Sequence, residues 1–170
     1  WNSSTATSSC SMAVSACTGG ANFNCLEAAT TPGTARLYTK LAGTPFSFDV
    51  VALNSSGTQE TNYVASGGTA KNVTVELFDD TTPVSCSAYV SPVASQTLSF
   101  ASVNAGRNTT ATFNLPNAYS KLRCRVTDAN APPTVYGCSS DDFSVRPQSF
   151  TVTSATANED GTGVSTITLA

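Results

Sequence analysis

Six cysteines are the side chains in this sequence with the most definite chemistry. They lie at Cys10, Cys17, Cys25, Cys86, Cys124 and Cys138 of a 170-residue chain. No C-x-x-C pair occurs and the chain contains no histidine, which argues against thioredoxin-type, haem-attachment and most zinc sites. An even number of cysteines without these motifs indicates three disulfides formed in an oxidising compartment. We therefore predict a secreted protein.

The acidic residues do not form a recognisable catalytic centre. Without histidine there is no Ser-His-Asp or Cys-His nucleophile pair, and neither G-x-S-x-G nor a P-loop motif occurs. Carboxylates occur in adjacent pairs at Asp79-Asp80 and Asp141-Asp142, but neighbouring residues of a strand point to opposite faces of a sheet. Such pairs make poor glycosidase dyads, so we expect no enzymatic activity and no organic cofactor.

A calcium site is the metal chemistry that the acidic residues could provide. Calcium needs several converging oxygen ligands, and the best local cluster is Asn158, Glu159, Asp160 and Gly161. Polar turn residues that cap and solvate a loop explain the same four positions more simply. We therefore predict no metal, with calcium at this turn as the alternative.

The basic residues include one ordered group. The net charge of −3 and the pI of about 4.7 argue against nucleic acid as a partner, because phosphates attract a basic surface. Lys121, Arg123 and Arg125 alternate along a strand-like run, so their side chains share one face. They form either a positive stripe that binds an acidic partner or the solvated outer face of a sandwich strand, and the second interpretation is the simpler.

The elements that carry these residues are predicted to be β-strands. Charged residues are only 11% while hydrophobic residues reach 40%, and the abundant Val and Thr favour half-buried strands. From about residue 35, apolar and polar residues alternate, as in strands with one buried face. Clear examples are the runs 46–50, 73–77 and 122–126. Turn-forming residues separate the runs, so we predict an all-β, immunoglobulin-like Greek-key β-sandwich stapled by disulfides.

The sequence divides into three parts. Residues 1–33 carry one charge, Glu27, and form a Cys-containing, Ser/Thr/Gly-rich lead segment. Residues 34–147 form the predicted sandwich, and residues 148–170 form the start of a following β-module or a strand-exchange tail. The strand-like run at the C-terminal end suggests a piece excised from a longer protein. No apolar run approaches the roughly 20 residues that span a bilayer.

The strand pattern favours one set of disulfides among the many that six cysteines allow. Cys124 lies on the inward face of its predicted strand, and Cys86 lies in another strand-like run. An intersheet bridge between these two cysteines is the preferred pairing. The set is completed by Cys10–Cys17 and by Cys25–Cys138.

Five segments of the chain resemble one known family. These segments are Phe23 to Glu27 (FNCLE), Leu37 to Phe46 (LYTKLAGTPF), Lys71 to Leu77 (KNVTVEL), Leu122 to Asp128 (LRCRVTD) and Phe143 to Gln148 (FSVRPQ). Together they resemble the C-terminal region of MshQ-type proteins, which are encoded with mannose-sensitive haemagglutinin pili, type IV pili of Gram-negative bacteria. The resemblance extends over about residues 23–155. It implies an exported protein of pilus assembly or of the pilus tip, and it assigns no catalytic residue.

These observations predict a non-catalytic extracellular module at the cell surface or pilus of a Gram-negative bacterium. The leading hypothesis is a structural or adhesive part of a pilus-associated protein, as a tip, assembly or filament component. Its expected partners are other pilus or surface proteins, or further copies bound through terminal strands. The alternative is a carbohydrate-binding β-sandwich module that mediates attachment to glycans through exposed aromatic rings. The candidates for that role are Trp1, Tyr63, Tyr89, Tyr119 and Tyr136.

Overall fold

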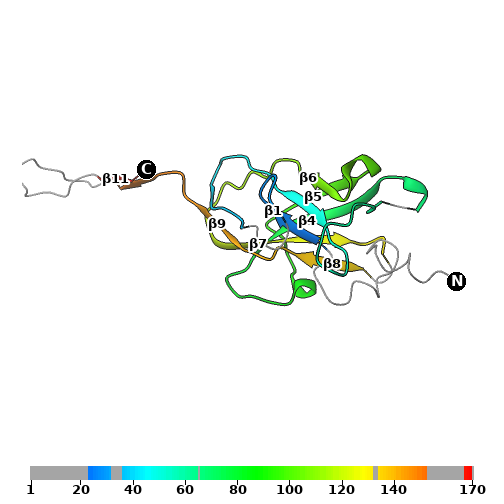
Figure 1. Ribbon diagram of the computed structural model, residues 1–170. Helices are drawn as coiled ribbons and strands as arrows, with labels where there is room; N and C mark the ends of the chain where they lie inside the picture. The colour runs from blue at the N-terminus through cyan, green and yellow to red at the C-terminus, as the bar shows by residue number, and fades with distance from the viewer. Residues whose placement is uncertain (1–22, 32–35, 65, 132–133, 153–166, 170) are drawn as a thin grey trace, which may run out of the picture.

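The computed structural model describes residues 23–31, 36–64, 66–131, 134–152 and 167–169. This part of the chain is all-β, with three short 3-10 turns and no α-helix, so the predicted fold class is confirmed. A three-stranded and a six-stranded sheet form a sandwich-like arrangement (Figure 1). The immunoglobulin-like Greek-key connectivity stays a prediction. No helix in the described ranges is long and apolar enough to cross a membrane.

The strands are distributed over three sheets. The smaller sandwich sheet has the order β1-β3-β6, and the larger has the order β2-β9-β7-β4-β5, with β8 also paired to β7. The bounds in the smaller sheet are β1 (Phe23–Leu26), β3 (Asp49–Ala52) and β6 (Arg107–Thr109). Those in the larger sheet are β2 (Lys40–Leu41), β4 (Lys71–Asp79), β5 (Ala94–Phe100), β7 (Tyr119–Asp128), β8 (Val135–Cys138) and β9 (Phe143–Arg146). A separate pair contains β10 (Phe150–Val152) and β11 (Ile167–Leu169), and the 3-10 turns are η2 (Ser66–Gly68), η3 (Cys86–Ala88) and η4 (Ser102–Asn104).

The two longest strands show how the sequence forms the sandwich. β4 and β7 pair antiparallel, with Val75 opposite Val126 and Leu77 opposite Cys124. These four side chains are fully buried because alternate residues of each strand face the other sheet. The opposite, outer face of β4 is polar except at Phe78, which is also buried. Another segment of the chain must therefore cover the outer face at Phe78.

Aromatic rings fill much of the core between the sheets. The ring centroids of Phe46 and Phe48 lie 5.5 Å apart. Tyr63 lies edge-on to both Phe23 and Phe100, with 5.2 Å between centroids in each case. Because Phe23 belongs to β1 and Phe100 to β5, the Tyr63 ring connects the two sheets through packing.

A buried ion pair lies beside this core. Lys71 Nζ is 2.6 Å from Asp128 Oδ2, and the two side chains are 8% and 2% exposed. The Tyr63 hydroxyl donates to the same oxygen at 2.7 Å, and Lys71 Nζ lies 4.8 Å from the Tyr63 ring centroid. Burial and the hydrogen bond to Asp128 together raise the pKa of Tyr63 far above its ordinary value. The phenol therefore stays neutral and serves as a donor.

Two disulfides connect four of the six cysteines, in pairs other than those expected. Cys25 of β1 is bonded to Cys124 of β7, with 6.2 Å between their Cα atoms, so this bridge joins the two sheets. Cys86 of η3 is bonded to Cys138 of β8, with 5.7 Å between Cα atoms. The expected pairs Cys86–Cys124 and Cys25–Cys138 are therefore wrong.

The two faces of the larger sheet explain the observed pairing. Cys124 points into the core, whereas Cys138 lies opposite Arg125 in the β7–β8 ladder and so shares the outer face with it. Cys86 lies in η3 and not in a strand, and its bond to Cys138 places it over that outer face. The sheet itself therefore separates Cys86 from Cys124. The predicted Cys10–Cys17 pair lies outside the described residues.

The sandwich begins earlier in the chain than expected. β1 lies within the predicted lead segment, residues 1–33, yet it pairs with β3 and carries the disulfide to β7. Residues 23–26 are therefore part of the sandwich, and residues 1–22 and 32–33 of the lead lie outside the described ranges. In the predicted following module, residues 148–170, β10 and β11 pair antiparallel with each other, and Figure 1 shows β11 apart from the sandwich strands.

Candidate functional site

The basic residues predicted as a partner-binding stripe, Lys121, Arg123 and Arg125, lie on the outer face of β7. Lys121 Nζ is 3.0 Å from Asp142 Oδ2 and 3.4 Å from Asp80 Oδ2. Arg123 contacts the same two carboxylates, at 3.1 Å for Asp80 and 3.4 Å for Asp142. The order β9-β7-β4 brings these four side chains together. The positive charges of Lys121 and Arg123 are therefore compensated within the chain.

Arg125, the third member of the stripe, is buried and holds a loop in place. Its Nη2 lies 2.8 Å from Glu76 Oε2, and its Nη1 donates to the backbone carbonyl of Tyr89 at 2.8 Å. The guanidinium carbon lies 4.4 Å from the ring centroid of Phe78 and 5.2 Å from that of Tyr136, within the range of cation–π attraction. This geometry gives Arg125 a structural role.

Asp80 is the fully buried acid of this network. Its carboxylate accepts hydrogen bonds from the Tyr89 hydroxyl and, at 3.1 Å, from Arg123 Nε. Burial by itself would raise the pKa of Asp80, but the bond from Tyr89 and the charges of Arg123 and Lys121 outweigh burial and lower it below its ordinary value. Burial and the Asp80 carboxylate raise the pKa of Tyr89 to about 12. At neutral pH the Asp80 carboxylate is therefore ionised and the Tyr89 hydroxyl that donates to it is neutral.

The substitution Asp80→Asn is expected to destabilise the protein at neutral pH. It should also make the Tm less dependent on pH in the acidic range. The folded pKa of Asp80 lies below the unfolded value of about 4, so the carboxylate stabilises the fold above that pH. This contribution is lost as the pH falls through the folded pKa. We expect D80N to lose about 2 kcal/mol at pH 7, and its Tm to fall less than that of the wild type between pH 5 and pH 2, as measured by circular dichroism.

The control for this experiment is Asp79→Asn at the adjacent, exposed acid. Asp79 accepts the backbone N–H of Thr81 at 2.9 Å, an interaction that asparagine retains. D79N should keep the pH profile of the wild type. Equal profiles for D80N and the wild type would contradict the role assigned to Asp80.

These contacts fix the chain that runs from Asp80 to β5; we name its residues 81–93 the clamped loop. The Cys86–Cys138 disulfide ties the loop to β8, and the Tyr89 ring stacks on Phe78 with 5.1 Å between centroids. The segment contains no charged residue. Figure 1 shows it as the green chain that runs with its short turn below β7 and β8. It is the segment that covers the outer face at Phe78.

Two valines of the clamped loop face solvent. Val84 is 46% exposed and Val90 is 80% exposed. The residue after Val90, Ser91, has a φ of 59°, in the left-handed region that costs a non-glycine residue about 1 kcal/mol. A serine keeps this conformation only where the surrounding contacts determine it. The clamps therefore fix the backbone that presents the two valines.

The tyrosines predicted as a sugar-stacking platform do not come together. Tyr63 and Tyr89 are buried, and Tyr119 is half-buried against the core. Tyr136 reaches the surface with 37% of its side chain exposed. Trp1 lies outside the described residues. Among the tyrosines so predicted, only Tyr136 is exposed, and a single ring does not make a platform.

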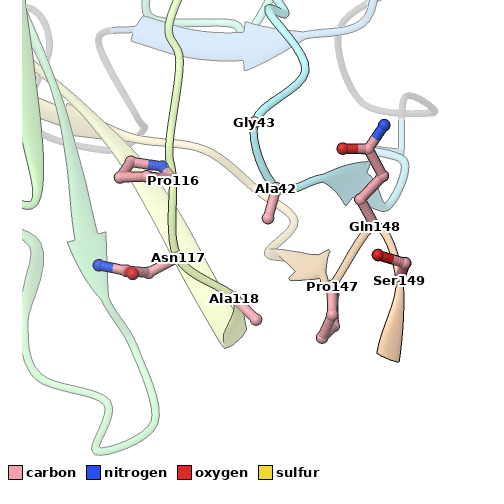
Figure 2. A pocket seen from close by; sticks show the side chains of 8 residues that line it. All are labelled: Ala42, Gly43, Pro116, Asn117, Ala118, Pro147, Gln148 and Ser149. Atoms are coloured by element: carbon pink, nitrogen blue, oxygen red, sulfur yellow. The ribbon is translucent and has the colours of Figure 1, made fainter. Parts of the chain in front are cut away.

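An open cleft of about 460 Å³ lies where the end of β2 meets the segments before β7 and after β9. None of its lining residues is ionisable, and Ala42, Ala118 and Pro147 are among them. Figure 2 shows the amide of Asn117 pointing away from Ala42 and Pro147. The backbone N–H groups of Ala42 and Gly43 already donate, at 2.9 and 2.8 Å, to other carbonyls. The cleft therefore offers a ligand the polar side chains of Asn117, Gln148 and Ser149 but no charge (Figure 2).

The remaining acids serve local structure. Asp141 Oδ2 accepts the backbone N–H of Leu37 at 3.1 Å. Within the part of the chain that the structure describes, no group of three or more His, Cys, Asp or Glu residues is placed to hold a metal ion. The turn considered for calcium, residues 158–161, lies outside the described residues.

The clamped loop and the carboxylates Glu76, Asp80 and Asp142 were not identified as a unit from the sequence. The sequence predicts Cys86 in a strand, whereas in the structure it lies in η3 of the loop. The signal in the sequence is the run of residues 81–93, which contains Pro83 and Pro92 and separates the charged β4 from β5. Prolines within such a run indicate a loop.

Taken together, the outer face is held rigid by the Cys86–Cys138 disulfide and by the ion pairs of Lys121, Arg123 and Arg125. These ionisable groups are engaged with one another. No protein-family model matches the chain, and no curated protein matches it either.

Proposed function

We propose that this protein is a non-catalytic structural and adhesive module of a pilus-associated surface protein of a Gram-negative bacterium. The observation that carries the proposal is the outer face of the larger sheet, where the Cys86–Cys138 disulfide and Arg125 hold the clamped loop rigid. Such disulfides persist in the periplasm and at the cell surface, where thiols are not kept reduced. A rigid, stapled sandwich suits a part that attaches or spaces other proteins.

The resemblance to MshQ-type proteins supports the link to pili. Two of the resembling segments, residues 23–27 and 122–128, contain Cys25 and Cys124, which form the bridge between the sheets. The resemblance therefore involves the residues that staple the core. As a module of this kind the protein is a tip, assembly or filament component. Neither the tyrosines nor the uncharged cleft gives comparable support to a carbohydrate-binding module.

Antibody raised against the purified chain is expected to label the outside of intact cells of the source organism, on or beside surface fibres. Immunogold electron microscopy of unpermeabilised cells is the measurement. Cells that lack the protein are the control for the antibody. Labelling that appears only after permeabilisation, inside the inner membrane, would contradict the proposed function.

A further inference from the structure

We propose that the Cys86–Cys138 disulfide is a thiol–disulfide exchange site on the folded protein. A dithiol reduces this bond while the Cys25–Cys124 bond stays intact, and the reduction frees residues 82–88 of the clamped loop. The reaction partner is identified by its chemistry as a reduced dithiol, such as the cysteine pair of a thiol–disulfide oxidoreductase. This inference goes beyond the proposed function and does not depend on it, because it concerns the chemistry of the chain itself.

The two bonds differ in their exposure to solvent. Cys25 and Cys124 are 1% and 0% exposed between the two sheets, whereas Cys86 and Cys138 are both half-buried at the outer face of the larger sheet. Exchange begins when a thiolate attacks a disulfide sulfur, so its rate depends on access to that sulfur. A dissolved thiol therefore reaches Cys86–Cys138 in the folded protein, but it reaches Cys25–Cys124 only after the sheets separate.

The clamped loop is attached to the sheet at two separate places. Tyr89 is the first, through its stack on Phe78 and the bond from Arg125 Nη1 to its carbonyl. Residues 82–88 are exposed except for the half-buried Cys86. The disulfide and a bond of 3.5 Å from Arg125 Nη1 to the Cys86 carbonyl join them to the sheet. Because 3.5 Å is long for a hydrogen bond, the disulfide is the main attachment of residues 82–88.

Reduction therefore changes one part of the loop and leaves the rest of the fold in place. Without the covalent bond, residues 82–88 regain the conformational freedom of an exposed loop. Tyr89 still covers Phe78 on the outer face, and the Cys25–Cys124 bond still joins β1 to β7. The change is local, and reoxidation of the two thiols reverses it.

The surroundings of the two cysteines determine which sulfur is attacked. Cys86 lies in the turn η3 between the exposed residues Ser85 and Ser87, so its sulfur is the one that a thiolate approaches from solvent. Cys138 lies opposite Arg125 in the β7–β8 ladder, on the same face of the sheet. A neighbouring guanidinium stabilises a thiolate. The attack therefore occurs at Cys86, and Cys138 is the leaving group.

The exchange is balanced in two steps. One thiolate of the reductant bonds to Cys86 Sγ, the Cys86–Cys138 bond breaks, and Cys138 leaves as a thiolate that takes up a proton from water. The second thiolate of the reductant then attacks the reductant's own sulfur in this mixed disulfide, and Cys86 leaves as a thiolate that is protonated in the same way. In total the protein gains two electrons and two protons, and the dithiol is oxidised to a disulfide.

The test uses the whole oxidised chain, without denaturant, and dithiothreitol as the dithiol. Samples are alkylated at successive times, and mass spectrometry measures the alkylation of each cysteine. We expect Cys86 and Cys138 to be alkylated at least about tenfold faster than Cys25 and Cys124. Circular dichroism should retain the β-sheet signal, and hydrogen exchange should accelerate in residues 82–88 but not in β4 or β7.

Cys86→Ser combined with Cys138→Ser is the matched variant, because its loop is free without any reductant. Its residues 82–88 should exchange as fast as those of the reduced wild type, and dithiothreitol should not change that rate. When glutathione, a monothiol, replaces dithiothreitol, the trapped mixed disulfide should lie on Cys86.

Four results would each overturn the exchange site. They are equal reduction rates for the two bonds, loss of the β-sheet signal on reduction of Cys86–Cys138, unchanged hydrogen exchange in residues 82–88, and glutathione trapped on Cys138. All four are measured on the purified chain, so none of them bears on the labelling of cells that tests the proposed function.

Discussion

Replacing Cys25 and Cys124 together by alanine is expected to lower the free energy of unfolding by about 4 kcal/mol. The bond joins residues 99 positions apart, so its loss frees a long loop in the unfolded chain. Both side chains are fully buried between β1 and β7, so the substitutions also leave unfilled space in the core. Urea denaturation of the wild type and C25A/C124A, followed by circular dichroism, measures the difference.

The matched comparison is the second disulfide. The Cys86–Cys138 bond spans 52 positions, and both of its cysteines are half-buried. C86A/C138A should therefore cost less stability than C25A/C124A, because it opens no space in the core. A larger loss of stability for C86A/C138A, or a loss below about 1 kcal/mol for C25A/C124A, would contradict the account of the two bridges.

The second large effect is expected at the buried ion pair. Asp128→Asn should lower the free energy of unfolding by about 3 kcal/mol, because the Lys71 ammonium, 8% exposed, would lose its counter-charge. Asparagine has the same shape and still accepts the bond from Tyr63. The loss therefore reports the uncompensated charge and not a cavity. Chemical denaturation at pH 7 is the measurement.

Two further variants separate this effect from others. In Lys71→Met combined with Asp128→Asn, no charge remains, so the double variant should lose less than the sum of the two single variants. Asp142→Asn breaks the half-exposed pair with Lys121 and should cost less than about 1 kcal/mol. Additive losses in the double variant, or an equal loss for D142N, would show that burial of Lys71 is not the cause.

Alternation in the sequence predicts the strands that have one face in the core. The runs 73–77 and 122–126 lie in β4 and β7, and all of their apolar residues are buried. Arg125 is buried as well, on the outer face beneath the clamped loop. β1 carries no such pattern, because its four consecutive residues are all buried. It also lies in a Ser/Thr-rich stretch that resembles a connector. Its pairing with β3 depends on residues far along the chain, which no local pattern reveals.

In the candidate site, too, local sequence patterns do not reveal which distant residues a side chain contacts. The alternation of Lys121, Arg123 and Arg125 predicts that they share a face, but it cannot show what covers that face. Glu76 lies in β4 and Asp142 lies just before β9, so both reach β7 only through the strand order of the sheet. In the same way, the disulfide pairs depend on which face of the sheet each cysteine occupies. The spacing of the cysteines in the sequence does not determine that face.

The most direct test of the account is the disulfide map of the native protein isolated from cell surfaces. Cleavage with trypsin and chymotrypsin under non-reducing conditions separates Cys25, Cys86, Cys124 and Cys138 onto different peptides and also separates Cys25 from Cys17, because Phe23 lies between these two cysteines and Arg123 and Arg125 flank Cys124. Mass spectrometry should find the Cys25 peptide linked to the Cys124 peptide, and the Cys86 peptide linked to the Cys138 peptide. Free thiols at these positions, or a link between Cys86 and Cys124, would contradict both the stapled core and the clamped loop.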